Sequence, residues 1–142
     1  MKSVRHVGIV VSDLNKALYF YQHLLGLKIV RQMNESGPYI DKVSGLKGVH
    51  VTTAKLAAGD GTLVELLRFN SHPHKTPGEK DMCEIGVSHV AFTVGNLDAE
   101  YTRLLGAGVR FNSPPQTSPD GYAKVAFCRD PDCSPIELVE VL

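Results

Sequence analysis

Apolar and polar residues alternate along residues 4–11, and β-branched residues dominate this stretch, which predicts a β-strand. From Leu14 onward the apolar residues recur at helical spacing. Asp13 is placed to cap this helix and Gly26 to end it. The first 26 residues therefore predict a strand followed by a helix with one buried face.

Three more strands are expected before the middle of the chain. Residues 27–32 look like a short strand, and residues 49–56 and 62–69 read as a hairpin around a turn that contains two glycines. The stretch from 72 to 81 is polar and contains two prolines, which is typical of a linker. One half of the protein therefore ends near residue 70.

The second half of the sequence repeats the first. Residues 6–14 align with residues 89–97 at an offset of 83, which superimposes His6 on His89. Nearer the end of each half, an offset of 72 superimposes Glu65 on Glu137. The first half carries 11 extra residues between its histidine and its glutamate, since 65 − 6 = 59 and 137 − 89 = 48. We assign this insertion to residues 34–48.

The repeat predicts one domain built from two modules. We expect a first module at about residues 3–70, a linker at about 71–85 and a second module at about 86–142. A chain of 142 residues is long enough to bury a sizeable core but too short for a two-domain enzyme.

Four polar side chains stand at matched positions among apolar residues, namely His6, Glu65, His89 and Glu137. Burial of a carboxylate without a partner costs several kcal/mol. Two imidazoles and two carboxylates that converge on one divalent cation satisfy these groups together and leave two octahedral positions for water or substrate. The repeat therefore predicts a metal site made of these four residues.

The composition restricts the classes of molecule that the protein is expected to bind. Fifteen basic and fifteen acidic residues cancel, so no global field favours nucleic acid or an anionic membrane. No apolar run is long enough to span a bilayer, and the N-terminal residues lack the pattern of an export signal. Three cysteines without a CxxC pair argue against a disulfide framework. We expect a cytoplasmic protein that acts on a small molecule.

The sequence resembles the vicinal oxygen chelate superfamily, which includes glyoxalase I, methylmalonyl-CoA epimerase, extradiol dioxygenases and fosfomycin-resistance enzymes. The resemblance rests on four segments that span nearly the whole chain: His6-Val-Gly-Ile, Tyr19 to Leu27, Ser88-His-Val-Ala-Phe, and Phe127-Cys-Arg-Asp-Pro-Asp leading to Ile136-Glu-Leu. It implies an α+β fold in which two tandem βαβββ modules form a cup-shaped half-barrel around a metal site. Cys133 departs from the family pattern, which commonly has glycine there, and this departure bears on the local turn geometry.

The type of residue at each ligand position points to one reaction class within that superfamily. The set His6, Glu65, His89, Glu137 is most similar to that of bacterial glyoxalase I and related epimerases. The resemblance implies one divalent ion (Zn, Ni, Co, Mn or Fe) and a lyase or isomerase that moves a proton next to a metal-bound carbonyl through an enediolate. In glyoxalase-like relatives the position of Glu137 is the one implied to act as base, and Glu65 then remains a structural ligand.

Two alternatives stay open, and both use the same fold. One is a binding or resistance protein that sequesters a small molecule without metal, and the other is an Fe(II) dioxygenase of the extradiol type, which would dispense with Glu65. The resemblance also implies a homodimer, because family members commonly dimerise through these modules and an exposed sheet edge favours association. The four ligands come from one chain or from two, since both arrangements leave the same residues in the sequence.

Overall fold

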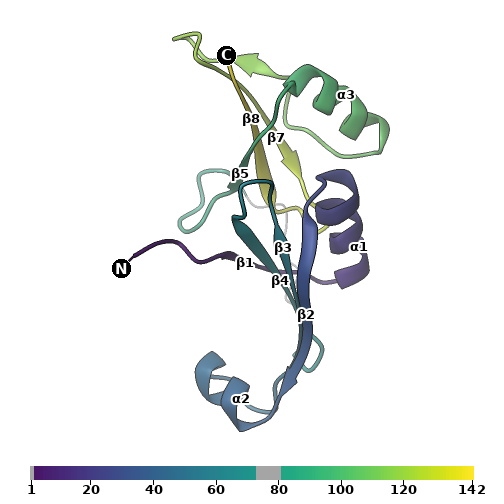
Figure 1. Ribbon diagram of the computed structural model, residues 1–142, viewed down its shortest axis with the longest axis vertical. Helices are drawn as coiled ribbons and strands as arrows, with labels where there is room; N and C mark the ends of the chain where they lie inside the picture. Colours follow the sequence, from purple (N-terminus) through teal and green to yellow (C-terminus); the bar gives the residue numbers. More distant parts are fainter. Residues whose placement is uncertain (1, 73–80) are drawn as a thin grey trace. The chain divides into compact units, whose positions relative to one another are not determined.

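The computed structural model describes residues 2–72 and 81–142, so residues 73–80 of the predicted linker lie outside the described residues. The chain divides into two compact units, Met1–Thr76 and Pro77–Leu142. Each unit contains one four-stranded sheet (Figure 1).

The first unit builds its sheet from strands that flank two helical segments. Its elements are β1 (Val7–Val10), α1 (Leu14–Leu18), the π-helix η1 (Tyr19–Leu24), β2 (Lys28–Ser36), α2 (Pro38–Ser44), β3 (His50–Ala57) and β4 (Leu63–Phe69). The strand order is β1-β4-β3-β2, with β1 parallel to β4 and the other neighbours antiparallel. This is a βαβββ module with α2 inserted between β2 and β3.

The second unit repeats this topology. Its elements are β5 (Val90–Thr93), α3 (Leu97–Gly106), β6 (Gln116–Thr117), β7 (Ala123–Arg129) and β8 (Pro135–Val141). The order β5-β8-β7-β6 again has its first strand parallel to its last. The described residues thus form eight strands in two four-stranded sheets with helices, which confirms the predicted α+β fold of two βαβββ modules.

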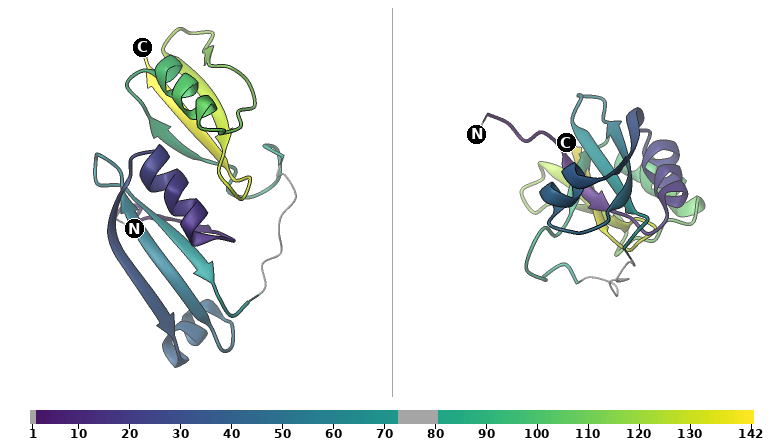
Figure 2. Two further views of the ribbon diagram at one scale, coloured as in Figure 1. Left: turned by 90° about the vertical axis from the view of Figure 1, so that its right-hand side faces the viewer. Right: turned by 90° about the horizontal axis from the view of Figure 1, so that it is seen from below.

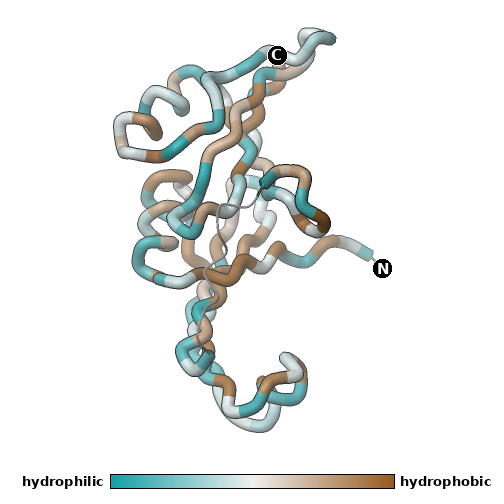
Figure 3. The backbone as a smooth tube through the Cα atoms, turned by 180° about the vertical axis from the view of Figure 1, so that it is seen from behind, coloured by the Kyte–Doolittle hydropathy of each residue, from teal (hydrophilic) through white to brown (hydrophobic). Residues whose placement is uncertain are grey.

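One helical segment covers one face of each sheet (Figure 2). The N-terminal caps of the two helical segments occupy equivalent positions in the sequence repeat. Asp13 accepts hydrogen bonds from the backbone N–H groups of Asn15 and Lys16, and Asn96, 83 residues later, accepts one from Ala99. The side chains between helix and sheet form a separate core in each unit, including Ala17, Phe20, Tyr21, Ala54, Leu56, Val64 and Leu66 in the first and Leu97, Leu104, Ala126, Ile136 and Leu138 in the second. The alternation of apolar and polar residues that places them can be followed in Figure 3.

Two boundaries differ from those predicted. The first strand begins at Val7 because backbone pairing with β4 starts there, so His6 lies one residue before β1, and His89 likewise lies one residue before β5. The predicted strand 27–32 extends to Ser36 because β3 continues to pair with it. The inserted stretch 34–48 contains the end of this strand and α2. Within the described residues, no helix has the length and apolarity needed to cross a membrane.

Asp41 holds the end of the α2 insertion in place. Its carboxylate accepts hydrogen bonds from the backbone N–H groups of Val49 (2.7 Å) and Gly48 (2.8 Å). These two bonds, with Val49 the stronger contributor, hold the pKa of Asp41 below its ordinary value. The contribution of Asp41 to the folded loop is therefore present above the ordinary aspartate pKa and is lost as the pH falls through the lowered value.

We expect the amide resonances of Gly48 and Val49 to titrate together in an NMR pH series, with a midpoint below the ordinary aspartate pKa. In Asp41→Asn the same two resonances should show no such titration, because the neutral amide does not ionise. A midpoint at or above the ordinary value would show that the carboxylate is not held by these bonds in solution.

Candidate functional site

His6 and Glu65 lie side by side in the first unit. The parallel pairing of β1 with β4 places Gly8 directly opposite Glu65, and His6 precedes Gly8 by two residues. The Nε2 atom of His6 is 2.9 Å from Oε2 of Glu65. Gly8 has no side chain on this face of the sheet. A Cβ atom at this position would lie 3.3 Å from the side chain of Leu67.

The second unit contains the equivalent pair. Ala91 lies opposite Glu137 across β5 and β8, and the Nε2 atom of His89 is 3.1 Å from Oε2 of Glu137. The repeat detected in the sequence therefore appears as two His–Glu pairs with the same arrangement, one in each unit. Within either unit, the described residues bring two such side chains together and form no group of three or more His, Cys, Asp or Glu suited to a metal ion.

These side chains remain accessible. The His side chains are 32% and 33% exposed, and the Glu side chains are 13% and 20% exposed. The two carboxylates are therefore largely covered, as the sequence pattern predicted, and the two imidazoles are about one-third exposed.

The spacing of the donor atoms suits a shared metal ion. Ions such as Zn²⁺ bind imidazole nitrogen and carboxylate oxygen at about 2.0–2.2 Å, so two donors at right angles around the ion lie about 3.0 Å apart. The observed separations of 2.9 Å and 3.1 Å agree with this value. They also fit a hydrogen bond from the imidazole to the carboxylate, which satisfies each pair when no ion is bound.

The two pairs differ in the residue that faces the glutamate from the neighbouring strand. Lys55 of β3 is opposite Glu65, and its Nζ lies 3.3 Å from Oε1 of Glu65. Phe127 of β7 is opposite Glu137, and its ring meets the His89 ring edge-to-face at a centroid distance of 5.2 Å. Glu65 thus has a cationic neighbour where Glu137 has an aromatic one.

The sequence repeat already contained this difference, because Lys55 and Phe127 are separated by the same 72 residues as the two glutamates. Without the strand register, nothing in the sequence marks either residue as a neighbour of the site.

The second ring nitrogens of the two histidines also differ. Nδ1 of His89 lies 2.7 Å from Oγ of Ser88, which orients the ring. Nδ1 of His6 is buried, and no hydrogen-bond partner lies near it among residues 2–72 and 81–142. A group bonded to the second nitrogen fixes the tautomer of a metal-binding histidine. Ser88 is therefore a supporting residue of the second pair.

Cys128 lies near the end of β7, and Cys133 lies in the turn that follows this strand. Burial raises the pKa of the Cys128 thiol to about 12, so this side chain is a neutral core group. Cys133 lies in the turn between β7 and β8 with a φ of 68°, a left-handed conformation that glycine adopts most easily. The departure from the family pattern at this position therefore keeps the turn and places a side chain in a glycine-like conformation.

Comparisons with known proteins agree with the topology. The sequence model of the Glyoxalase/Bleomycin resistance protein/Dioxygenase superfamily matches residues 3–138. The chain belongs to this superfamily, which confirms the resemblance found in the sequence.

Individual relatives span the whole chain. The uncharacterized protein YwkD of Bacillus subtilis is 32% identical over 142 residues, covering 99% of this chain and 98% of YwkD. A probable lactoylglutathione lyase of Vibrio cholerae is 26% identical and covers 96% of this chain and 89% of its own. The crystal structure of a glyoxalase family protein from Bacillus cereus superimposes with a TM-score of 0.90 at 26% identity, covering 100% of this chain and 95% of the other.

Proposed function

We propose that the protein is a divalent-metal-dependent lyase or isomerase that transfers a proton at a carbon next to a carbonyl group, in the manner of glyoxalase I or of a related epimerase. The observation that carries the proposal is the repeated His–Glu pair, with donor separations of 2.9 Å and 3.1 Å that match neighbouring ligands of one ion.

His6, Glu65, His89 and Glu137 would together hold one ion, which we propose to be Zn, Ni, Co, Mn or Fe. Imidazole and carboxylate donors are common to the sites of these metals. When bound, such an ion supplies a Lewis acid that polarises a carbonyl oxygen and makes the neighbouring C–H more acidic.

Glu137 is the proposed base. Glu65 has two close partners, the His6 imidazole and the Lys55 ammonium, and both restrain its carboxylate. Glu137 has the His89 contact and lies opposite the Phe127 ring, which offers no hydrogen bond to its oxygens. The Glu137 carboxylate is therefore freer to reach toward a substrate C–H, accept its proton and deliver it to a neighbouring position.

The names of two relatives suggest a first substrate to test. Relatives in Vibrio cholerae and in Schizosaccharomyces pombe are named as a probable lactoylglutathione lyase and a lactoylglutathione lyase, at 26% and 28% identity. We propose a carbonyl compound of this kind, with or without a thiol carrier. Methylglyoxal mixed with glutathione, methylglyoxal alone and a hydroxy-ketone such as acetoin separate these possibilities.

A metal-independent binding protein is the second candidate, and one contact favours it. The Lys55 ammonium neutralises Glu65 without an ion, so the first pair is electrostatically satisfied in the metal-free state. A binder should take up its ligand equally well before and after treatment with a chelator.

Elemental analysis of protein purified without added metal tests the proposal. We expect a divalent transition metal in stoichiometric amount, and we expect it to be lost on dialysis against a strong chelator and regained on addition of a single metal. Protein that is folded, metal-free and unable to bind any of the five ions would contradict the proposal.

Ser88→Ala should weaken metal binding by about 10-fold or more, because it removes the oxygen that orients the His89 ring. Affinity is measured by competition with a chromogenic chelator. Ser113→Ala, on an exposed loop where the hydroxyl donates to the carbonyl oxygen of Pro114, is the matched control and should leave affinity unchanged. Equal affinity in Ser88→Ala and wild type would show that the hydroxyl does not support the ligand.

We also propose that the protein acts as a homodimer. Edge strand β2 of the first sheet carries the exposed apolar residues Ile29 and Val30, which a partner chain would cover. The proposed metal site is compatible with ligands from one chain or from both.

A further inference from the structure

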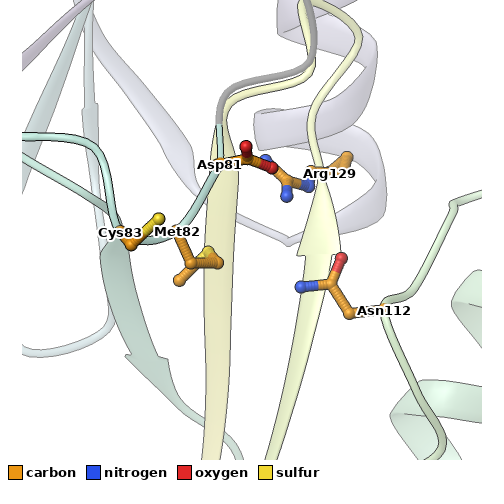
Figure 4. Close-up of a pocket in the computed structure, with 5 residues that line it drawn as sticks. All are labelled: Asp81, Met82, Cys83, Asn112 and Arg129. Carbon is orange, nitrogen blue, oxygen red and sulfur yellow. The ribbon is translucent and has the colours of Figure 1, made fainter.

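An open cavity of about 590 Å³ lies beside β7 within the second unit (Figure 4). Its lining residues are Asp81, Met82, Cys83, Asn112 and Arg129. The volume is within the range of pockets that hold small organic molecules. One cation, one anion, one amide and two sulfur-containing side chains give this cavity both polar and apolar walls.

The cavity is close to the His89–Glu137 pair along the same sheet. Phe127 of β7 is opposite Glu137, and Arg129 follows two residues later, so both belong to the same face of the strand. Two residues of strand correspond to about 7 Å. The backbone N–H of Asn112 donates to the carbonyl of Phe127 at 2.9 Å, which places Asn112 beside this part of β7. The cavity therefore lies beside the same strand that carries the neighbour of Glu137, about two residues further along it.

The guanidinium of Arg129 is held in the wall of the cavity. The residue is only 9% exposed, and its Nη1 donates to the carbonyl oxygen of Cys133 at 3.1 Å. Figure 4 shows the guanidinium and the Asp81 carboxylate pointing toward one another, with the Asn112 amide on the other side of Arg129.

We propose that this cavity binds a carboxylate group of the substrate. The catalytic part of this proposal rests on the proposed function. The Arg129 guanidinium and the Asn112 amide N–H groups supply the donors, and guanidinium–carboxylate contacts are among the stronger hydrogen bonds in proteins. Met82 and Cys83 contact the carbon chain. The substrate class is a carbonyl compound that carries its carboxylate a few bonds from the reacting carbon.

Asp81 selects for a single negative charge. The charges of Arg129 and Asp81 cancel, so these two residues together give the cavity wall no net charge. A monoanionic carboxylate adds one charge beside Asp81, whereas a phosphate dianion adds nearly two, and like charges at short range in a partly enclosed site repel strongly. Removal of the Asp81 charge should therefore strengthen the binding of anions.

The test compares 4-oxopentanoate with its methyl ester by isothermal titration calorimetry on the full-length protein, with and without chelator. The acid should bind at least about 10-fold more tightly than the neutral ester and more tightly than inorganic phosphate. Arg129→Gln should lower its affinity by about 10-fold or more. Arg103→Gln, which alters an exposed arginine paired with Glu100 on α3, is the matched control and should change nothing.

Two variants of exposed residues keep the test decisive if Arg129→Gln fails to fold. Asn112→Asp should weaken binding of the acid, and Asp81→Asn should strengthen it. Equal binding of acid and ester, phosphate binding as tight as that of the acid, or unchanged affinity in both exposed variants would overturn the proposal. We expect the acid to bind in chelated protein as well. Loss of the metal proposal would therefore leave acid binding intact, whereas failure of this subsite would abolish the preference for the acid.

Discussion

Glu137→Gln is expected to keep its metal and to lose turnover by about 10²- to 10⁴-fold, the range that general-base catalysis supplies. The amide retains an oxygen donor and nearly the same shape, but it does not accept a proton at neutral pH. In the structure Glu137 faces Phe127 across the sheet, and a phenyl ring cannot accept the proton in place of the carboxylate. Metal content and solvent deuterium exchange under single-turnover conditions separate binding from proton transfer.

Glu65→Gln is the matched variant from the other unit. It should change metal affinity more than the rate of proton transfer, because Glu65 is tied to both His6 and Lys55 and is assigned a structural role. Deuterium exchange at the wild-type rate in Glu137→Gln, together with its loss in Glu65→Gln, would reverse the two assignments.

His6→Ala and His89→Ala should each weaken metal binding by more than about 100-fold, because loss of a ligand exceeds the usual cost of losing a group that supports one. The two residues lie in different units. If both pairs hold one ion, the wild type binds one ion per chain and each substitution releases that ion. Affinity is measured by chelator competition, and folding is checked by circular dichroism.

His23→Ala is the control for this pair of variants. His23 is exposed in η1, and its ring stacks on Tyr19 at a centroid distance of 5.2 Å. It should bind metal as the wild type does. A large loss in one of His6→Ala and His89→Ala with none in the other would show that a single unit holds the ion and that the four-ligand site is wrong.

The repeat in the sequence predicted the topology because hydrophobic periodicity and capping residues act locally. The Asp13 and Asn96 caps, the Gly26 helix stop and the strand pattern before each glutamate all specify elements without knowledge of the rest of the fold. The two His–Glu contacts follow from the same logic, because the parallel pairing of the first and last strands brings the ends of each module together.

The neighbours of the site could not be predicted in this way. The positions of Lys55 and Phe127 opposite the glutamates depend on strand register, which the turns and the buried face set jointly. The cavity beside Arg129 depends on the irregular segments around residues 81–83 and 112, where no periodic pattern exists. The contact between the Ser88 hydroxyl and Nδ1 of His89 depends on the side-chain conformations, which the sequence pattern does not specify.

Metal-dependent exchange of a substrate proton with solvent tests the central claim most directly. The purified protein is incubated in deuterium oxide with methylglyoxal and glutathione, and with acetoin, before chelation, after chelation and after metal is restored. We predict that at least one compound gains deuterium at the carbon next to the carbonyl. This exchange should be lost on chelation and should return when metal is restored. Exchange that continues unchanged in metal-free protein, or stoichiometric metal without exchange in any compound that binds, would contradict it.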